Sequence, residues 1–152
     1  MRRSIAAGLL IAASLSMCGL LDVGAAEAAD IARIKSVAGT ASVVRGKAVT
    51  PAVAGALLQA SDEITTGADG RVGITFIDNS RFAVGPNSAI ALSEFEFNDT
   101  THAGRSLTTV NRGALAIVSG QIAKENKDAM KVRTPTSLLA ARGTRFVVEV
   151  AP

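Results

Sequence analysis

The sequence predicts an all-β domain, with short strands and hairpins packed as a compact sandwich or as a short, solenoid-like roll. Apolar residues alternate with small or polar ones over 72–76 and again over 82–84, the period of a strand with one buried face. Gly, Pro, Asn and Asp interrupt the chain every few residues, which favours short strands over long helices. The chain has five Phe and no Trp or Tyr, so we expect a core built mainly from Val, Ile, Leu and Ala.

The clearest local signal is a hairpin that turns at residues 78–80, where Asp, Asn and Ser follow one another. These residue types close tight turns. Opposed residues of an antiparallel pair share a face, so a three-residue loop at 78–80 would pair Phe76 with Phe82. A two-residue loop at 78–79 would pair Phe76 with Arg81 and spoil the apolar face. We therefore predict the three-residue loop, as a type I turn followed by a bulge.

The rest of the chain is predicted as further short strands separated by turns. We expect an opening strand pair over 31–44, a connection over 47–59, strands at 64–66, 89–97, 107–118, 132–135 and 144–150, and loops at 98–105 and 124–127. The segment 137–141 is ambiguous between strand and a helical turn, which is too short to be stable alone. The glycine spacing of 39–46 returns at 113–120. This echo marks the halves of a sandwich, the coils of a solenoid, or a chance match.

The first 28 residues have the three parts of a secretory signal peptide. A basic start is followed by an apolar stretch from Ile5 to Leu21 and by small residues at Ala26 and Ala28, which predicts cleavage before Ala29. A lipoprotein signal cleaved before Cys18 and an uncleaved membrane anchor are the alternatives. We divide the chain into a signal peptide at 1–28 and one domain at 29–152, and we expect the mature protein in the periplasm.

Composition narrows the partners of this domain. The formal charge is +3, a mild excess that does not indicate nucleic-acid binding. No later stretch approaches the ~20 apolar residues of a membrane span, so we expect no membrane insertion after signal cleavage. Cys18 is the one cysteine, which leaves the mature chain without a disulfide or a thiolate site. With Phe as the sole aromatic type, stacking surfaces for sugars or single-stranded nucleic acid are not expected.

No residue pattern predicts an enzyme, a metal site or a cofactor. His102 is the one histidine and lies in a polar loop, where solvation is its expected state. Glu94 and Glu96 would share a strand face, but we expect both to face water rather than to form the carboxylate pair of a glycosidase. Gly67 and Gly70 mark a turn, since no phosphate-loop Lys follows them.

Four short patterns, in this order, resemble the FecR domain, the periplasmic module of iron-dicitrate-type sigma regulators. They are the glycine-bounded stretch 39–46, the run from Leu58 to Thr66, the hairpin turn at 78–80, and an ending formed by 134–135 and 141–148. The resemblance covers nearly the whole mature chain. Ser61 and Asn79 stand where the family usually has Gly, so only the local backbone geometry departs from the pattern.

The resemblance implies contact with another protein. Regulators of this family carry an anti-sigma region and a membrane helix before the FecR domain, whereas a signal peptide is predicted here. We therefore expect a free-standing periplasmic binding or interaction module with a regulatory or sensory role, and another envelope protein as its partner. A passive envelope scaffold and a carboxylate-based hydrolase are the alternatives, and the oligomeric state stays open.

Four residues are the candidates for structural or interaction roles: Arg142, Asp62, Glu63 and Asp78. Arg142 lies where an apolar segment gives way to the last strand. A guanidinium buried there needs a carboxylate partner, and we expect Asp62 or Glu63. The alternative is that Arg142 contacts a ligand. Asp78 opens the predicted hairpin turn.

Overall fold

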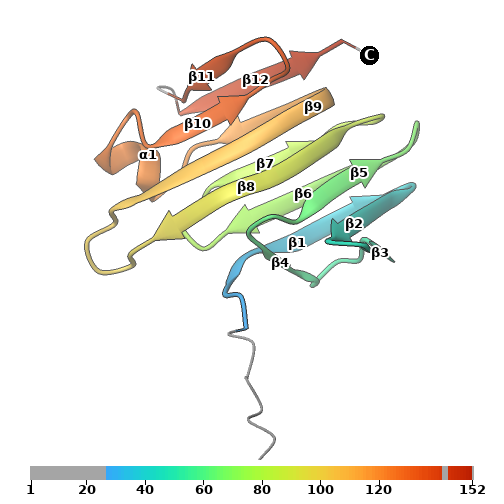
Figure 1. The fold of residues 1–152 in the computed structure, drawn as a ribbon, viewed down its shortest axis with the longest axis horizontal. Helices are drawn as coiled ribbons and strands as arrows, with labels where there is room; N and C mark the ends of the chain where they lie inside the picture. The colour runs from blue at the N-terminus through green and yellow to red at the C-terminus, as the bar shows by residue number, and fades with distance from the viewer. Residues whose placement is uncertain (1–26, 142–143, 152) are drawn as a thin grey trace, which may run out of the picture.

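The computed structural model describes residues 27–141 and 144–151, and within them the chain is almost entirely β-structure (Figure 1). The predicted all-β class is confirmed. The elements are β1 (Asp30–Ala38), β2 (Ala41–Arg45), β3 (Ala48–Pro51), β4 (Leu57–Gln59), β5 (Glu63–Thr66), β6 (Arg71–Phe76), β7 (Arg81–Val84), β8 (Ala89–Phe97), β9 (Gly104–Val118), α1 (Gln121–Glu125), β10 (Met130–Arg133), β11 (Leu138–Ala140) and β12 (Arg145–Val150). The predicted signal peptide and its lipoprotein alternative at Cys18 fall on residues 1–26, outside the described residues, and stay predictions.

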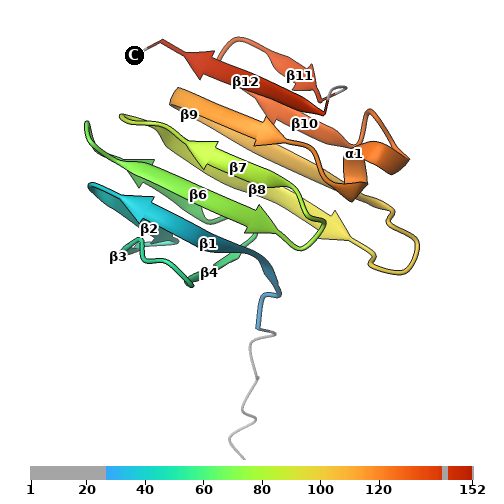
Figure 2. The ribbon, with the colours of Figure 1, turned by 180° about the vertical axis from the view of Figure 1, so that it is seen from behind.

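The strands form one continuous sheet that curls until its two arms face each other (Figures 1 and 2). Arm A has the strand order β4-β1-β6-β7-β9-β12, and arm B has the order β3-β2-β5-β8-β9-β10-β11. The long strand β9 belongs to both arms, because its first half pairs with β8 and its second half with β7 and β12. The bend falls at Gly113, at φ 85°, where a Cβ would lie 2.1 Å from Ser88 Oγ. Only glycine tolerates both conditions.

Stacked turns at one end of the molecule carry the chain from one arm to the other. Gly67 N donates to Thr40 O at 2.9 Å, and Thr40 N donates to Asp69 Oδ1 at 3.1 Å. In the next layer Thr66 N donates to Ser88 O at 2.9 Å, and Ala114 N donates to Ser88 Oγ at 3.0 Å. These bonds satisfy the polar backbone of the turns and fix the order of the strands.

The predicted opening strand pair at 31–44 is wrong in its pairing, although both strands exist. β1 pairs with β4 and β6, while β2 pairs with β3 and β5. Gly39, at φ 65°, carries the chain across to the other arm, so the two strands face each other through the core. A hairpin and such a crossing have the same turn residues, and alternation alone does not distinguish them.

Apolar side chains from both arms fill the space between them. Ile34, Leu58 and Ile74 from arm A meet Ile64 and Ile90 from arm B, each at most 2% exposed. The ring of Phe76 lies 4.5 Å from that of Phe82 and 5.2 Å from that of Phe95, measured between centroids. The few large side chains therefore gather in one cluster inside the curl.

The central hairpin turns one position earlier than predicted. Ile74, not Phe76, is opposite Phe82, and the three-residue loop is 77–79. Asn79 takes a left-handed φ of 65°, as the bulge after a type I turn requires. Ser80 belongs to the paired backbone, because its carbonyl accepts from Phe76 N at 2.9 Å, and it is fully buried and donates to the Asp78 carboxylate. The shift moves the register by two residues, so both Phe side chains still face the core.

Two further segments differ from the sequence prediction, and the structure decides a third that was ambiguous. The connection 47–59 contains the edge strands β3 and β4, and the ambiguous segment 137–141 forms β11. The loop predicted at 124–127 is partly the helix α1, whose Ile122 is fully buried between the arms. Burial against residues remote in sequence fixes β4 and α1 through Leu58 and Ile122, whereas β3 and β11 are exposed and pair with the strand just before them. Propensity over three to five residues is too weak to predict such short elements.

Candidate functional site

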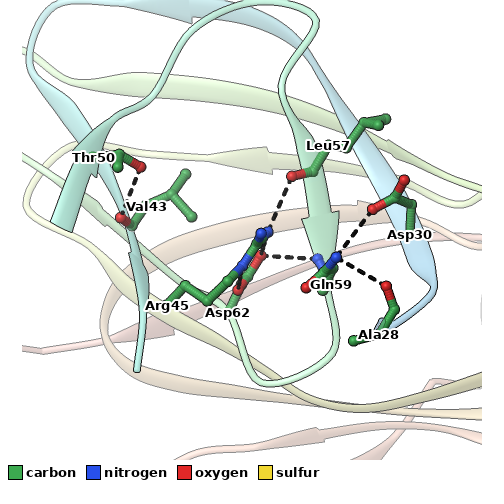
Figure 3. A network of polar contacts seen from close by, with 8 residues as sticks. All are labelled: Ala28, Asp30, Val43, Arg45, Thr50, Leu57, Gln59 and Asp62. Atoms are coloured by element: carbon green, nitrogen blue, oxygen red, sulfur yellow. Dashed lines mark hydrogen bonds and ion pairs between the residues drawn. The ribbon is translucent and has the colours of Figure 1, made fainter. Parts of the chain in front are cut away.

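Asp62 is held by a two-pronged contact with Arg45 (Figure 3). Arg45 Nε donates to Asp62 Oδ1 at 2.8 Å, and Arg45 Nη2 donates to Oδ2 at 2.7 Å. The backbone N–H of Gln59 also donates to Oδ2, at 2.8 Å. The hydrogen bond with Asp62 raises the pKa of Arg45 above its ordinary value, so the guanidinium stays charged. The pair ties β2 to the turn between β4 and β5.

The partner predicted for Asp62 was Arg142, which lies outside the described residues. Arg45 and Gln59 bond both carboxylate oxygens of Asp62 in the structure. Glu63 is partly exposed on the outer side of β5, paired across the sheet with Val44 and Ala91. The role of Arg142 stays a prediction, and sequence analysis did not single out Arg45 as a binding partner.

Asp78 is buried where the central hairpin meets the helix α1. Its carboxylate accepts from Ser80 N at 3.0 Å, from Ser80 Oγ at 2.8 Å and from Ile122 N at 3.4 Å. Its carbonyl accepts from Gln121 N at 2.8 Å. Asp78 thus satisfies free N–H groups at the start of a helix that is remote in sequence. Both buried aspartates hold turns in place and leave no carboxylate oxygen directed at solvent.

A different group of residues forms the candidate binding site: the outer face of arm A, which we call the cationic face. It carries five exposed basic side chains, Arg33, Lys35, Arg71, Arg81 and Arg145, against the acidic Asp30 and Glu149. Among the described residues none of the five has an ion pair or side-chain hydrogen bond. An array of unneutralised cations on one sheet face attracts an acidic partner.

Three of these arginines stand in one row across the strands. The pairings run from Arg33 to Thr75, Arg81, Val118 and Arg145, on β1, β6, β7, β9 and β12. Opposed residues share a face, and strands lie about 4.8 Å apart. The guanidinium groups therefore start from backbone positions about 10 Å apart, with only Thr75 and Val118 between them.

Beside this row the surface of arm A is made of small residues. An open depression of about 560 Å³ lies over Ser36, Gly73, Ala83 and Gly85, with Arg71 at its rim. A Cβ on Gly73 would lie 2.5 Å from Ser36 Oγ, so glycine leaves room here for the Ser36 side chain. No aromatic ring lines it, so the depression offers no stacking platform.

The outer face of arm B carries charges of both signs. Its exposed or partly exposed charged residues include Glu63, Glu94, Glu96, Arg105, Lys131 and Arg133, and Arg112 is a further exposed basic residue in the half of β9 that pairs with β8. Arg105 lies 3.0 Å from Glu96 and 3.9 Å from Glu94, and both glutamates are exposed, as predicted. The two faces of the molecule therefore differ in electrostatic character, and arm B is the natural control surface.

Other features of the described residues offer little chemistry. His102 takes a left-handed φ of 58° and stacks against Phe97, with ring centroids 6.2 Å apart. Within residues 27–141 and 144–151 no three His, Cys, Asp or Glu side chains are grouped as a metal site would need. No helix in the same part of the chain is long and apolar enough to cross a membrane.

Fold and surface together define an all-β domain with one cationic face. A model of the FecR protein family matches residues 62–152, and the chain belongs to this family. Domains of the FecR family are periplasmic or envelope-associated and regulatory or sensory. Comparison with curated proteins and with solved structures gives no match. The matched region begins at Asp62, yet β1 and β2 are hydrogen-bonded into both arms, so the structural unit extends before it.

Proposed function

We propose that this protein is a periplasmic FecR-domain module that binds an acidic surface of another envelope protein through its cationic face. The observation that carries the proposal is the row of Arg33, Arg81 and Arg145, which have no ion pairs among the described residues. Leaving three arginines unneutralised on one face gains nothing for folding. A passive scaffold has no need of such a face, so a binding role in envelope regulation or sensing is favoured.

The shape of the cationic face supports a protein partner over a sugar or a nucleic acid. The outward residues between the arginines are small, among them Gly73, Thr75, Ala83 and Ala116. A smooth sheet surface can lie against another protein, whereas sugars and single strands bind to exposed aromatic rings. The carboxylate-hydrolase alternative has no such support, because Arg105 pairs with both Glu94 and Glu96.

The stacked turns also favour the solenoid-like roll over the sandwich as the description of this fold. Each crossing at 39–40, 67–70 and 85–88 sends consecutive strands to opposite arms, as successive coils of a roll do. In a sandwich the sheets would be joined by fewer crossings between hairpins.

The test of the binding role compares charge reversal on the two arms. The double variant Arg33→Glu/Arg81→Glu changes the cationic face, and Lys131→Glu/Arg133→Glu makes the same charge change on arm B. Both proteins and the wild type are titrated with poly-L-glutamate, as an acidic probe, and used to capture proteins from envelope extracts of the source cells.

We expect the arm A variant to lose binding to poly-L-glutamate and to any specifically captured protein, while the arm B variant keeps both interactions. Binding should weaken as salt rises, since exposed charges are screened within about 8–10 Å at 0.1–0.15 M ionic strength. Equal binding by the two variants would refute the cationic face as the site.

A further inference from the structure

The last strand, β12, is an unusually complete free edge. Among the described residues β12 has a neighbour on one side only, β9. The other edge strands are short: β4 and β11 have three residues each, and β3 has four and ends in Pro51. Proteins protect sheet edges by shortness, proline or bulges. β12 has six residues, no proline and no register shift against β9.

The hydrogen-bonding parity of β12 shows which of its backbone groups face the free edge. Ser119 N donates to Thr144 O at 2.9 Å, so the even-numbered residues bond to β9 in this antiparallel pair. Hydrogen-bonded residues alternate in such a pair. The backbone N–H and C=O groups of Arg145, Val147 and Glu149 therefore point away from β9.

The side chains of these three residues are complementary to those of a second copy of β12 when the two antiparallel strands are centred on Val147. Arg145 and Glu149 lie two positions before and after it, and all three side chains are on the outer face. In an antiparallel pairing of two copies centred on Val147, Arg145 of each copy is opposite Glu149 of the other. Opposite charges across a strand pair are stabilising. Val147, 66% exposed, would pack against its equivalent in the second copy.

We propose that two copies of this chain pair symmetrically through β12, centred on Val147. The pairing uses the outward backbone groups of residues 145, 147 and 149 in both copies. The free hydrogen-bonding groups, the opposite charges and the two-fold symmetry all favour the same register. β11 precedes β12 in the chain and ends close to the beginning of β12 (Figure 1). The two-fold axis places β11 of the second copy at the opposite end of the strand pair. The β11 strands of the two copies therefore do not face each other.

The dimer joins the two A arms into one sheet and sets both cationic faces on the same side. Arg145 then pairs with Glu149 across the axis, while Arg33 and Arg81 of both copies remain free. Two linked faces bind a partner with repeated acidic surfaces more tightly than one face does. The contact is a single strand edge, smaller than a standard interface, so we expect a dimer that dissociates on dilution.

Cysteine cross-linking tests the register. In the full chain with Cys18→Ser, Val147→Cys places two thiols on residues about 5.5 Å apart, as in a hydrogen-bonded pair, within the range of a disulfide. Arg145→Cys alone puts them about 14 Å apart, since the two positions are four residues apart along the strands and on neighbouring strands. We expect Val147→Cys to form a covalent dimer under mild oxidation and Arg145→Cys to stay monomeric. A mixture of Arg145→Cys with Glu149→Cys should cross-link as a heterodimer.

Charge exchange tests the same pairing without a covalent bond. In sedimentation velocity over a concentration series, Glu149→Arg should weaken the dimer about tenfold, because two like-charge pairs replace two attractive ones. The double variant Arg145→Glu/Glu149→Arg should restore it, whereas Arg33→Glu/Arg81→Glu should leave it unchanged. Cross-linking of Arg145→Cys as efficient as that of Val147→Cys, or a wild type that is monomeric at every concentration, would overturn the proposal and leave the cationic face untouched.

Discussion

Arg45 and Asp62 form a two-pronged ion pair in which one partner is buried and the other half exposed. The side chain of Asp62 is 1% exposed and that of Arg45 is 50% exposed. Replacing Arg45 with Ala leaves a buried carboxylate bonded only to the N–H of Gln59. We expect a loss of about 3 kcal/mol in the free energy of unfolding, at the low end of the ~3–5 kcal/mol range for buried pairs, because Arg45 is partly solvated.

Denaturant unfolding of Arg45→Ala checks this value, and Arg45→Lys should recover little, since Lys lacks the planar two-pronged donor. The matched control is Arg105→Ala, which removes an exposed arginine from Glu94 and Glu96 and should cost less than about 1 kcal/mol. Equal losses for Arg45→Ala and Arg105→Ala would show that Asp62 does not depend on its pair.

Truncation of the aromatic cluster should be strongly destabilising. Phe76→Ala or Phe82→Ala removes a ring that is 3% exposed, and we expect a cost of about 3–5 kcal/mol for each. The two losses should not be additive, because the rings are 4.5 Å apart and residues in contact are energetically coupled. Chemical denaturation of the two single variants and the double variant measures the coupling. Ile77→Ala, at a neighbouring residue that is 52% exposed, is the control and should change stability by less than about 0.5 kcal/mol.

Two turn residues with left-handed backbones should tolerate glycine. Ser61 has φ 73° and Asn79 has φ 65°, a conformation costing roughly 1 kcal/mol for most residues and less for Asn. We expect Ser61→Gly to raise the melting temperature and Asn79→Gly to be neutral or slightly stabilising. The reverse change, Gly39→Ala, should lower it, because a Cβ there would lie 2.2 Å from Asp69 O. A lower melting temperature for Ser61→Gly would contradict this account.

The mature protein should begin near Ala29, as the small residues at 26 and 28 predict. Intact-mass measurement of the protein from the periplasm checks the cleavage site directly. A species that begins at Cys18 and carries added lipid mass would instead place the protein on a membrane surface. Cys18→Ser separates the two, because it abolishes lipidation and leaves ordinary cleavage unchanged.

The candidate site illustrates what one sequence can predict. Alternation with buried neighbours identifies Arg71 and Arg81 as outward-facing residues of the central hairpin. It does not reveal that Arg33 and Arg145, more than a hundred residues apart, stand in one row with Arg81. The row exists because β1 pairs with β6 and β12 pairs with β9, and such long-range pairings leave no trace in local periodicity.

The sequence by itself determined the all-β class, most strand positions, the inward direction of Phe76 and Phe82, and the turn chemistry of Asn79. These follow from period-two alternation and from backbone preferences, which act over a few residues. Only the tertiary structure decided that β1 and β2 lie in opposite arms, that Arg45 holds Asp62, and that β12 presents odd-numbered residues at a free edge. Each depends on which distant segments meet when both arms bury their apolar faces, and that choice minimises the free energy of the whole core rather than of any one segment.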